Sequence, residues 1–197
     1  MNLIIDDVRI AYDRIKGHIV KTPIITNELL NNEIGANIFF KLENLQKTES
    51  FKIRGATNNL LAFHQKNGKF PDKITTTSSG NHAIAIAYLS KKFGIKDSII
   101  FIDKDAAKIK IEESRKYQSQ VIVTESKLES NILVNQKVAE GNYMCNSYGD
   151  EDVILGQATA TFEAINQIDE EIDAIFTPCG GGGLVSGAYI VASGLSY

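Results

Sequence analysis

The chain has 197 residues, and 43% of them are hydrophobic, which is enough to form the core of one domain or of two small ones. Its 21 basic and 24 acidic residues are interspersed and leave a formal charge of -3, so neither nucleic acid nor a membrane surface is an expected partner. No apolar stretch approaches transmembrane length and the two cysteines form no C-x-x-C pair, so a membrane span, a disulfide framework and a zinc site are not expected.

The first part of the chain predicts two helices. The N-terminus meets two aspartates before any sizeable apolar run, so no secretory segment is expected and we interpret the protein as cytoplasmic. Residues 4–16 carry apolar side chains at helical spacing, with Gly17 as an expected left-handed cap. Thr26 is expected to cap a short helix that runs through Glu33 and ends at Gly35.

A strand, a polar loop and a longer helix are expected next. The strand is predicted at 37–43, the loop at 44–50 and the helix at 53–67. Lys52 therefore lies at a junction between a loop and a helix.

From residue 68 onward, short β-rich runs alternate with amphipathic helices. Strands are expected at 73–77, 98–102, 120–124 and 142–145, with helices at 82–93, 106–117 and 126–140 between them. This repetition predicts an α/β fold with a doubly wound, mainly parallel sheet covered on both faces. A helix at 153–167 and a strand at 173–177 follow, and domain boundaries are expected near residues 70 and 145.

Lys52 is a candidate Schiff-base lysine. It lies within T-E-S-F-K-I-R-G-A (48–56), between an aromatic and a β-branched neighbour, Phe51 and Ile53. Partial desolvation there lowers the pKa of an ammonium toward that of the neutral amine, which attacks carbonyl groups. The alternative is a surface lysine whose stem lies along apolar groups while its head stays in water.

The segment T-T-S-S-G-N-H-A (76–83) predicts an anion site. It follows an expected strand and begins an expected helix, so backbone amides and hydroxyls converge on a helix N-terminus. Simple capping by Ser78, Ser79 or Asn81 is the alternative. His82 taken alone is more often structural than catalytic.

A second phosphate-type site is predicted at T-P-C-G-G-G-G-L-V-S-G (177–187). Consecutive glycines between a strand and a helix indicate close approach of a ligand to the main chain, and successive amides suit a phosphate. The spacing is not G-x-G-x-x-G and the Walker lysine is missing, so neither dinucleotide nor P-loop binding is indicated. A flexible hinge is the alternative.

Together these segments resemble the fold-type II family of pyridoxal-phosphate enzymes, in particular its threonine/serine dehydratase and serine racemase branch. The landmarks are K-T-P-I (21–24), K-L-E-N-L-Q-K-T (41–48), S-F-K-I-R-G-A (50–56), S-S-G-N-H-A (78–83), G-Q-A-T (156–159) and G-G-G-G (180–183). The resemblance implies a truncated tryptophan-synthase-β-like fold. Residues 1–70 and 146–197 would belong to the large cofactor-binding domain, and residues 71–145 would form the small α/β domain.

The resemblance also implies residue roles, with pyridoxal 5'-phosphate as cofactor, a small amino acid as substrate and no metal site that can be located. Lys52 would form the Schiff base and remove the α-proton, and in racemases a serine at the position of Ser79 acts as a second base. Cofactor contacts would come from Phe51, Lys52, Asn81, Gly180, Gly181, Gly182 and Gly183. Substrate contacts would come from Ser78, Ser79, Gly80, Asn81 and His82.

Three functions remain open at this point. The first is a dehydratase (ammonia-lyase) that converts L-threonine or L-serine to a 2-oxo acid and ammonia. The second is an inactive remnant, or a partial subunit that a homo-oligomer or a completing chain makes whole, and the third is a serine racemase. Glu49 stands where the family commonly has glycine, and the strands that supply the pyridine-nitrogen partner in relatives are missing.

Overall fold

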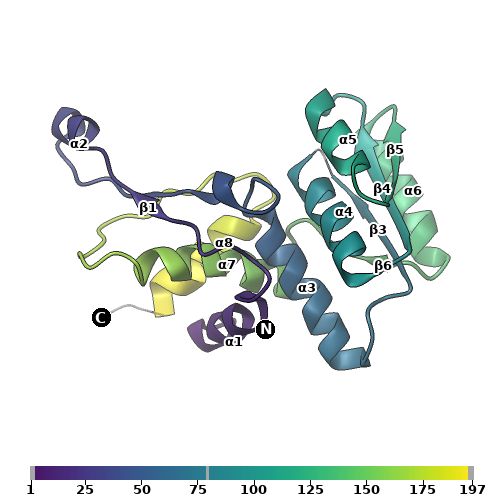
Figure 1. The fold of residues 1–197 in the computed structure, drawn as a ribbon, viewed down its shortest axis with the longest axis horizontal. Coiled ribbons are helices and arrows are strands. Elements are labelled where there is room, and N and C mark those ends of the chain that lie inside the picture. The colour runs from purple at the N-terminus through teal and green to yellow at the C-terminus, as the bar shows by residue number, and fades with distance from the viewer. Residues whose placement is uncertain (1–2, 79, 195–197) are drawn as a thin grey trace.

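The computed structural model describes residues 3–78 and 80–194, and it contains a four-stranded parallel sheet (Figure 1). The strand order is β5-β4-β3-β6, with β3 (Lys73–Thr77), β4 (Asp97–Asp103), β5 (Gln120–Thr124) and β6 (Tyr143–Met144). β3 and β5 match the predicted ranges, β4 is longer by one residue at each end, and β6 is shorter than predicted. The predicted α/β class with a mainly parallel sheet is confirmed.

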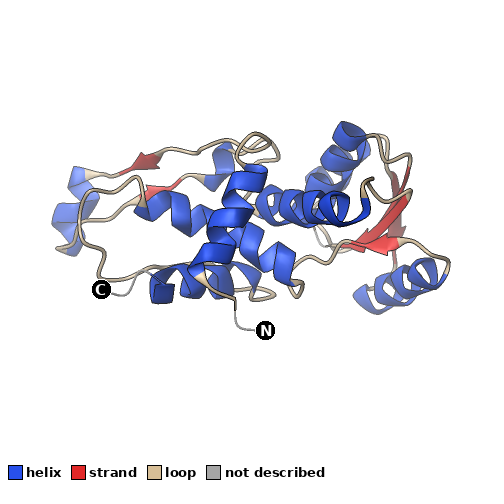
Figure 2. Ribbon diagram, turned by 90° about the horizontal axis from the view of Figure 1, so that it is seen from below, coloured by secondary structure: helices blue, strands red, loops and turns tan. Residues whose placement is uncertain are grey.

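Helices cover both faces of this sheet (Figures 1 and 2). α4 (Asn81–Phe93) and α5 (Lys108–Arg115) lie on one face, and α6 (Lys127–Ala139) lies on the other. Crossovers between parallel strands are right-handed. The chain runs outward from β3 through β4 to β5 and then returns in the opposite direction to form β6 beside β3. The helix of the returning crossover therefore lies on the opposite face from the helices of the outward crossovers. The sheet is therefore doubly wound.

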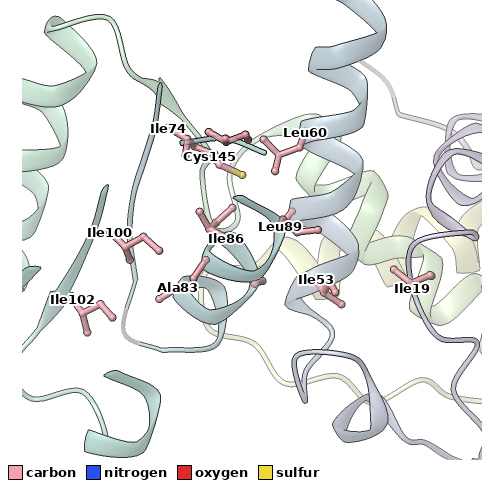
Figure 3. Close-up of a cluster of buried hydrophobic side chains, with 14 of the residues drawn as sticks. Ile19, Ile53, Leu60, Ile74, Ala83, Ile86, Leu89, Ile100, Ile102 and Cys145 are labelled. Carbon is pink, nitrogen blue, oxygen red and sulfur yellow. The ribbon is translucent and has the colours of Figure 1, made fainter. Parts of the chain in front are cut away.

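α4 is buried on almost all sides because it lies between the sheet and α3 (Lys52–Asn67), as Figure 3 shows. A helix that is apolar around its whole circumference is stable only in such a position. Ile86 and Leu89 of α4 pack in one cluster with Ile100 of β4 and Leu60 of α3. This core fixes the start of α3 relative to the carboxyl ends of the strands.

On its other side α3 packs with α1 (Ile5–Ile15) and α7 (Glu151–Ile165), and α8 (Gly183–Gly194) packs on α7 and α1. Glycines allow the closest approach between α3 and α7. A Cβ placed on Gly156 of α7 would lie 2.6 Å from Cα of Gly55 in α3, so a larger residue there would push the two helices apart. The division into residues 1–70 with 146–197 and residues 71–145 stays a prediction.

The N-terminal part departs from the prediction in its caps and strand. α2 (Glu28–Ile34) is capped by Asn27, whose Oδ1 accepts from Leu30 N at 3.0 Å, and not by Thr26. Gly35 closes α2 with a φ of 74°, as expected, whereas Gly17 has no positive φ and the cap of α1 is Lys16 in a helical conformation.

The predicted strand at 37–43 pairs over only two residues. β2 (Phe40–Lys41) is antiparallel to β1 (Ile24–Ile25), and the chain then turns into the 3-10 helix η1 (Glu43–Leu45). The turn of η1 therefore ends the strand early.

The predicted strand at 173–177 is wrong. These residues belong to no strand, and Phe176 is 95% exposed. A strand needs a neighbour to satisfy its backbone groups, and none of the residues 3–78 and 80–194 provides one here. Within the same residues, no helix combines the length and the apolar character needed to cross a bilayer.

Candidate active site

Lys52 is the first residue of α3 and is half-buried. Its Nζ donates a hydrogen bond to the carbonyl of Ser147 at 2.8 Å and lies 5.3 Å from the ring centroid of Phe51. Burial lowers the pKa of the Lys52 ammonium. The side chain therefore points to a segment 95 residues further along the chain and does not extend into solvent as a surface lysine would.

A buried ion cluster holds this end of α3. Arg54 is fully buried, and its guanidinium pairs with both carboxylate oxygens of Glu43 at 2.7 and 2.8 Å and with Glu163 of α7 at 2.7 Å. Burial alone would lower the pKa of Arg54, but the hydrogen bonds to Glu43 and Glu163 outweigh burial and raise it. Lys41 adds a second cation at 2.8 Å from Glu163. The cluster links α3, η1, α7 and β2, and its member on α3, Arg54, lies two residues after Lys52.

The segment that follows β3 forms the start of α4. Oγ of Ser78 accepts from the amides of Gly80 at 3.1 Å and Ala83 at 3.2 Å, so Ser78 caps this helix, as the capping alternative anticipates. Gly80 has a φ of 157°, a conformation that favours glycine. The buried Oδ1 of Asn81 has no hydrogen-bond partner among the described residues. Ser79 lies outside the described residues.

His82 is buried, and its ring contacts the residue that directly follows β6. Its Nε2 lies 3.1 Å from the carbonyl of Cys145, and Oγ1 of Thr76 donates to the same carbonyl at 2.8 Å. A carbonyl only accepts, so Nε2 carries the proton. Burial lowers the pKa of His82 to about 4, and the nearby charge of Lys52 contributes to this shift. The other ring nitrogen, Nδ1, is buried and has no hydrogen-bond partner among the described residues.

The glycine loop packs on the residues that follow β6. A Cβ on Gly181 would lie 2.3 Å from the ring of Tyr148, and one on Gly183 would lie 3.0 Å from the carbonyl of Tyr148. In contrast, a Cβ on Gly180 or on Gly182 would meet nothing within 4 Å. The loop therefore rests on Tyr148 on one side and faces open space on the other, next to the first amides of α8.

Residues 145–148, called the exit segment here because they leave β6, connect all three predicted segments. Cys145 contacts His82, Ser147 contacts Lys52, and Tyr148 contacts Gly181. β3 and β6 are parallel neighbours, so the residues that follow them meet at one edge of the sheet, where ligands bind in open α/β sheets.

Sequence reasoning missed the exit segment. Its one signal is the polar and aromatic run N-S-Y-G-D directly after an expected strand.

The arrangement fits pyridoxal phosphate. The glycine loop offers a phosphate a cradle with open space at Gly180 and Gly182, and Lys52 is a half-buried amine with a lowered pKa for the aldehyde. Asn81 has a buried oxygen without a partner among the described residues. A cavity of about 440 Å³ lies elsewhere, at the opposite ends of β3 and β6 near Lys73 and Tyr143, and contains none of these groups.

Comparisons with known proteins agree with this chemistry. The sequence profile of a family described as "pyridoxal-phosphate dependent enzyme" matches residues 15–194. A serine racemase of Arabidopsis thaliana is 38% identical over 190 residues, which are 95% of this chain and 56% of the racemase. A β-hydroxyaspartate dehydratase of Paracoccus denitrificans is 37% identical over 193 residues, 97% of this chain and 60% of the dehydratase.

A solved structure of a T.th. threonine deaminase superposes with a TM-score of 0.90 at 31% identity, covering 98% of this chain and 62% of the deaminase. The chain thus spans less than two thirds of the length of each of these proteins. It belongs to the family of pyridoxal-phosphate-dependent enzymes, with pyridoxal 5'-phosphate as the family's cofactor.

Proposed function

We propose that this chain carries the cofactor-binding part of a dehydratase (ammonia-lyase) for 3-hydroxy amino acids, with L-threonine or L-serine as substrate and a 2-oxo acid and ammonia as products. One observation carries the proposal: the half-buried Lys52 and the glycine loop both contact the exit segment. When bound, pyridoxal phosphate supplies an electron sink for the charge that develops at the substrate Cα. The relatives' names add racemisation and hydroxyaspartate dehydration as related chemistries.

Lys52 has two tasks in this proposal. Its amine would hold the cofactor's aldehyde beside Phe51, and the same amine would accept the α-proton of the substrate. Burial lowers the pKa of Lys52, so more of the neutral amine is present at neutral pH. The carbonyl of Ser147 fixes where Nζ lies.

Other residues hold the two reactants. The amides of Gly180, Gly181, Gly182 and Gly183 would hold the cofactor phosphate at the start of α8. The side-chain amide of Asn81 would bond the cofactor's phenolic oxygen. The substrate carboxylate binds at the start of α4, where the helix dipole favours a negative charge, and its contacts come from Ser78, Ser79, Gly80, Asn81 and His82.

Racemisation is the second candidate, because an Arabidopsis serine racemase is among the relatives. Product analysis with L-serine separates the two activities: pyruvate release should exceed formation of D-serine. Replacing Ser79 by alanine should then reduce D-serine formation more than pyruvate release, since only racemisation needs a second base. Faster racemisation than elimination in the unaltered chain would overturn the dehydratase proposal.

A partial subunit is the third candidate. The relatives are longer, and the residues 173–177 have no strand partner among the described residues. Partner strands from a homo-oligomer or a completing chain would cover this part of the protein and fix the cofactor ring.

A further inference from the structure

The cavity of about 440 Å³ lies where β3 and β6 begin, whereas the candidate active site lies where these strands end. Its volume is in the range of about 300–1,000 Å³ that small-molecule pockets occupy. One wall is apolar: it contains the buried Pro71 and the rings of Phe63 and Tyr143, whose centroids are 4.6 Å apart. The end of α3, the start of β3 and the start of β6 therefore enclose a space of the right size for a small ligand.

Polar groups complete the walls of this cavity. Asn142 is 6% exposed, and its buried Oδ1 has no hydrogen-bond partner among the described residues. Lys73 lies 4.0 Å from Asp97, whereas Lys69 lies 2.7 Å from Asp72. Buried acceptors are nearly always paired in proteins, so Asn142 lacks a donor that a ligand can supply. The cavity thus offers an unused acceptor and, in Lys73, a cation that is only loosely neutralised.

Tyr143 connects the cavity to the exit segment. β6 consists of Tyr143–Met144 alone, so this wall lies two residues before Cys145, where the exit segment begins. The hydroxyl of Tyr143 donates to Oδ1 of Asn59 at 2.9 Å, and Nδ2 of Asn59 donates to Oδ1 of Asp150 at 3.0 Å. Asp150 is the N-cap of α7, two residues after the exit segment. Tyr143 is therefore linked to both ends of the segment that contacts Lys52.

We propose that this cavity is a regulatory site for a small zwitterion with an apolar body, the chemistry of a free amino acid with an aliphatic side chain, and that its ligand holds the exit segment in place. The ammonium donates to Oδ1 of Asn142, the carboxylate pairs with Lys73, and the apolar body packs on Phe63 and Tyr143. An amine or a carboxylate alone leaves one of the two polar groups unmatched. A ligand that prefers the ordered exit segment shifts the protein toward that state.

Three probes with one carbon skeleton test the site. L-leucine carries both charged groups, 4-methylpentanoate lacks the amine, and 3-methylbutylamine lacks the carboxylate. Isothermal titration of the cofactor-free chain should show the tightest binding for L-leucine. Lys73→Met keeps the stem and removes the charge, so it should weaken binding of L-leucine and 4-methylpentanoate on the order of fivefold, as for an exposed ion pair. Binding of 3-methylbutylamine should not change.

Asn142→Leu has the complementary effect, because it keeps the volume and removes the acceptor. It should weaken binding of L-leucine and 3-methylbutylamine and leave 4-methylpentanoate unchanged. Lys91→Met is the matched control, since it makes the same charge change at an exposed position of α4 outside the cavity. If Asn142→Leu does not fold, the exposed Lys73 decides. No binding of L-leucine, or equal binding in Lys73→Met and the unaltered chain, overturns the proposal.

Hydrogen exchange measured by mass spectrometry tests the link to the exit segment. L-leucine should slow amide exchange in residues 145–148 of the unaltered chain and leave α2 unchanged. Tyr143→Phe keeps the ring and removes the bond to Asn59, so it should bind L-leucine and lose part of this protection. Unchanged exchange in the unaltered chain saturated with L-leucine overturns the regulatory role. Both tests work without cofactor, so their outcome is independent of whether the chain is a dehydratase.

Discussion

Glu49 occupies a backbone conformation that suits glycine. Its φ is 55°, and it is the one non-glycine residue with positive φ in the described part of the chain. The left-handed region costs a residue with a Cβ about 1–2 kcal/mol. The bond from its amide to the carbonyl of Gln46 at 2.9 Å holds this turn, which leads directly into Ser50, Phe51 and Lys52.

Replacing Glu49 by glycine should therefore raise the free energy of unfolding. We expect a gain of about 0.5–1 kcal/mol, because removal of the strain exceeds the extra entropy of glycine in the unfolded chain. Urea denaturation followed by circular dichroism measures it. Glu49→Ala removes the charge and keeps the strain, so a gain of equal size in that variant would contradict the backbone explanation.

His82 should make stability depend on pH. Its pKa is about 4 in the folded chain and near the ordinary value of 6.5 in the unfolded chain, so the unfolded chain binds more protons between these values. The free energy of unfolding should therefore fall as pH falls from 6.5 to 4, with a contribution from His82 on the order of 3 kcal/mol. His82→Gln, which keeps a donor toward Cys145, should flatten this dependence.

Thr76→Val is the matched control for His82, since it removes the other hydrogen bond to the carbonyl of Cys145 without a titratable group. Its loss of stability should be the same at every pH between 4 and 6.5. Thermal melts at three pH values in this range distinguish the two. A variant His82→Gln with the full pH dependence of the unaltered chain would mean that other groups cause it.

At the level of elements, the ion cluster under α3 holds the start of this helix. Glu163→Gln leaves Arg54 and Lys41 with one negative partner fewer in a buried place. Removing one member of a buried pair destabilises proteins by about 3–5 kcal/mol, and we expect a loss in that range. Asp6→Asn breaks the exposed pair with Arg9 and should change stability by less than about 1 kcal/mol.

The outcome for Glu163→Gln is measured by chemical denaturation, with Asp6→Asn as the reference. A loss as small as that of Asp6→Asn would show that the cluster does not hold α3 against α7. Near-ultraviolet circular dichroism then reports whether packing around the buried cluster persists.

Local patterns were sufficient to predict most elements. The β-branched runs at 73–77 and 120–124 form strands with the predicted bounds, and Lys52 begins a helix as its flanking residues indicate. The strand at 173–177 fails for a physical reason: strand residues are ordered by their neighbours, and none of the described residues lies beside them as a strand.

Contacts between distant segments could not be predicted. The bonds from the exit segment to Lys52 and His82 join residues far apart in the chain and leave no periodic signal. The resemblance of motifs predicts the residues of the candidate site, whereas the contacts of the exit segment with them are visible only in the fold.

At the scale of the whole molecule, large apolar side chains are exposed both before and after the glycine loop in the sequence. Phe176 is 95% and Tyr189 of α8 is 72% exposed. Exposed apolar groups that lie close together mark surfaces that associate with another chain or aggregate. The chain spans 56% of the Arabidopsis serine racemase to which it is similar.

The chain alone should therefore self-associate and be a weak catalyst even when it binds the cofactor. A cofactor ring that is misplaced by about 1 Å loses on the order of 100-fold in rate. Sedimentation velocity should show less association for Phe176→Ser than for Leu29→Ser, because Leu29 is exposed on another element, α2. A monodisperse monomer with the turnover of a longer relative would refute this expectation.

The assignment of Lys52 as the lysine that binds the cofactor is the central claim, and one measurement tests it most directly. The chain is incubated with pyridoxal phosphate, reduced with borohydride, digested and mapped by mass spectrometry. The account predicts that the phosphopyridoxyl label lies on the peptide with Lys52 and disappears in Lys52→Gln. A label on another lysine in the unaltered chain, with Lys52 unmodified, would contradict it.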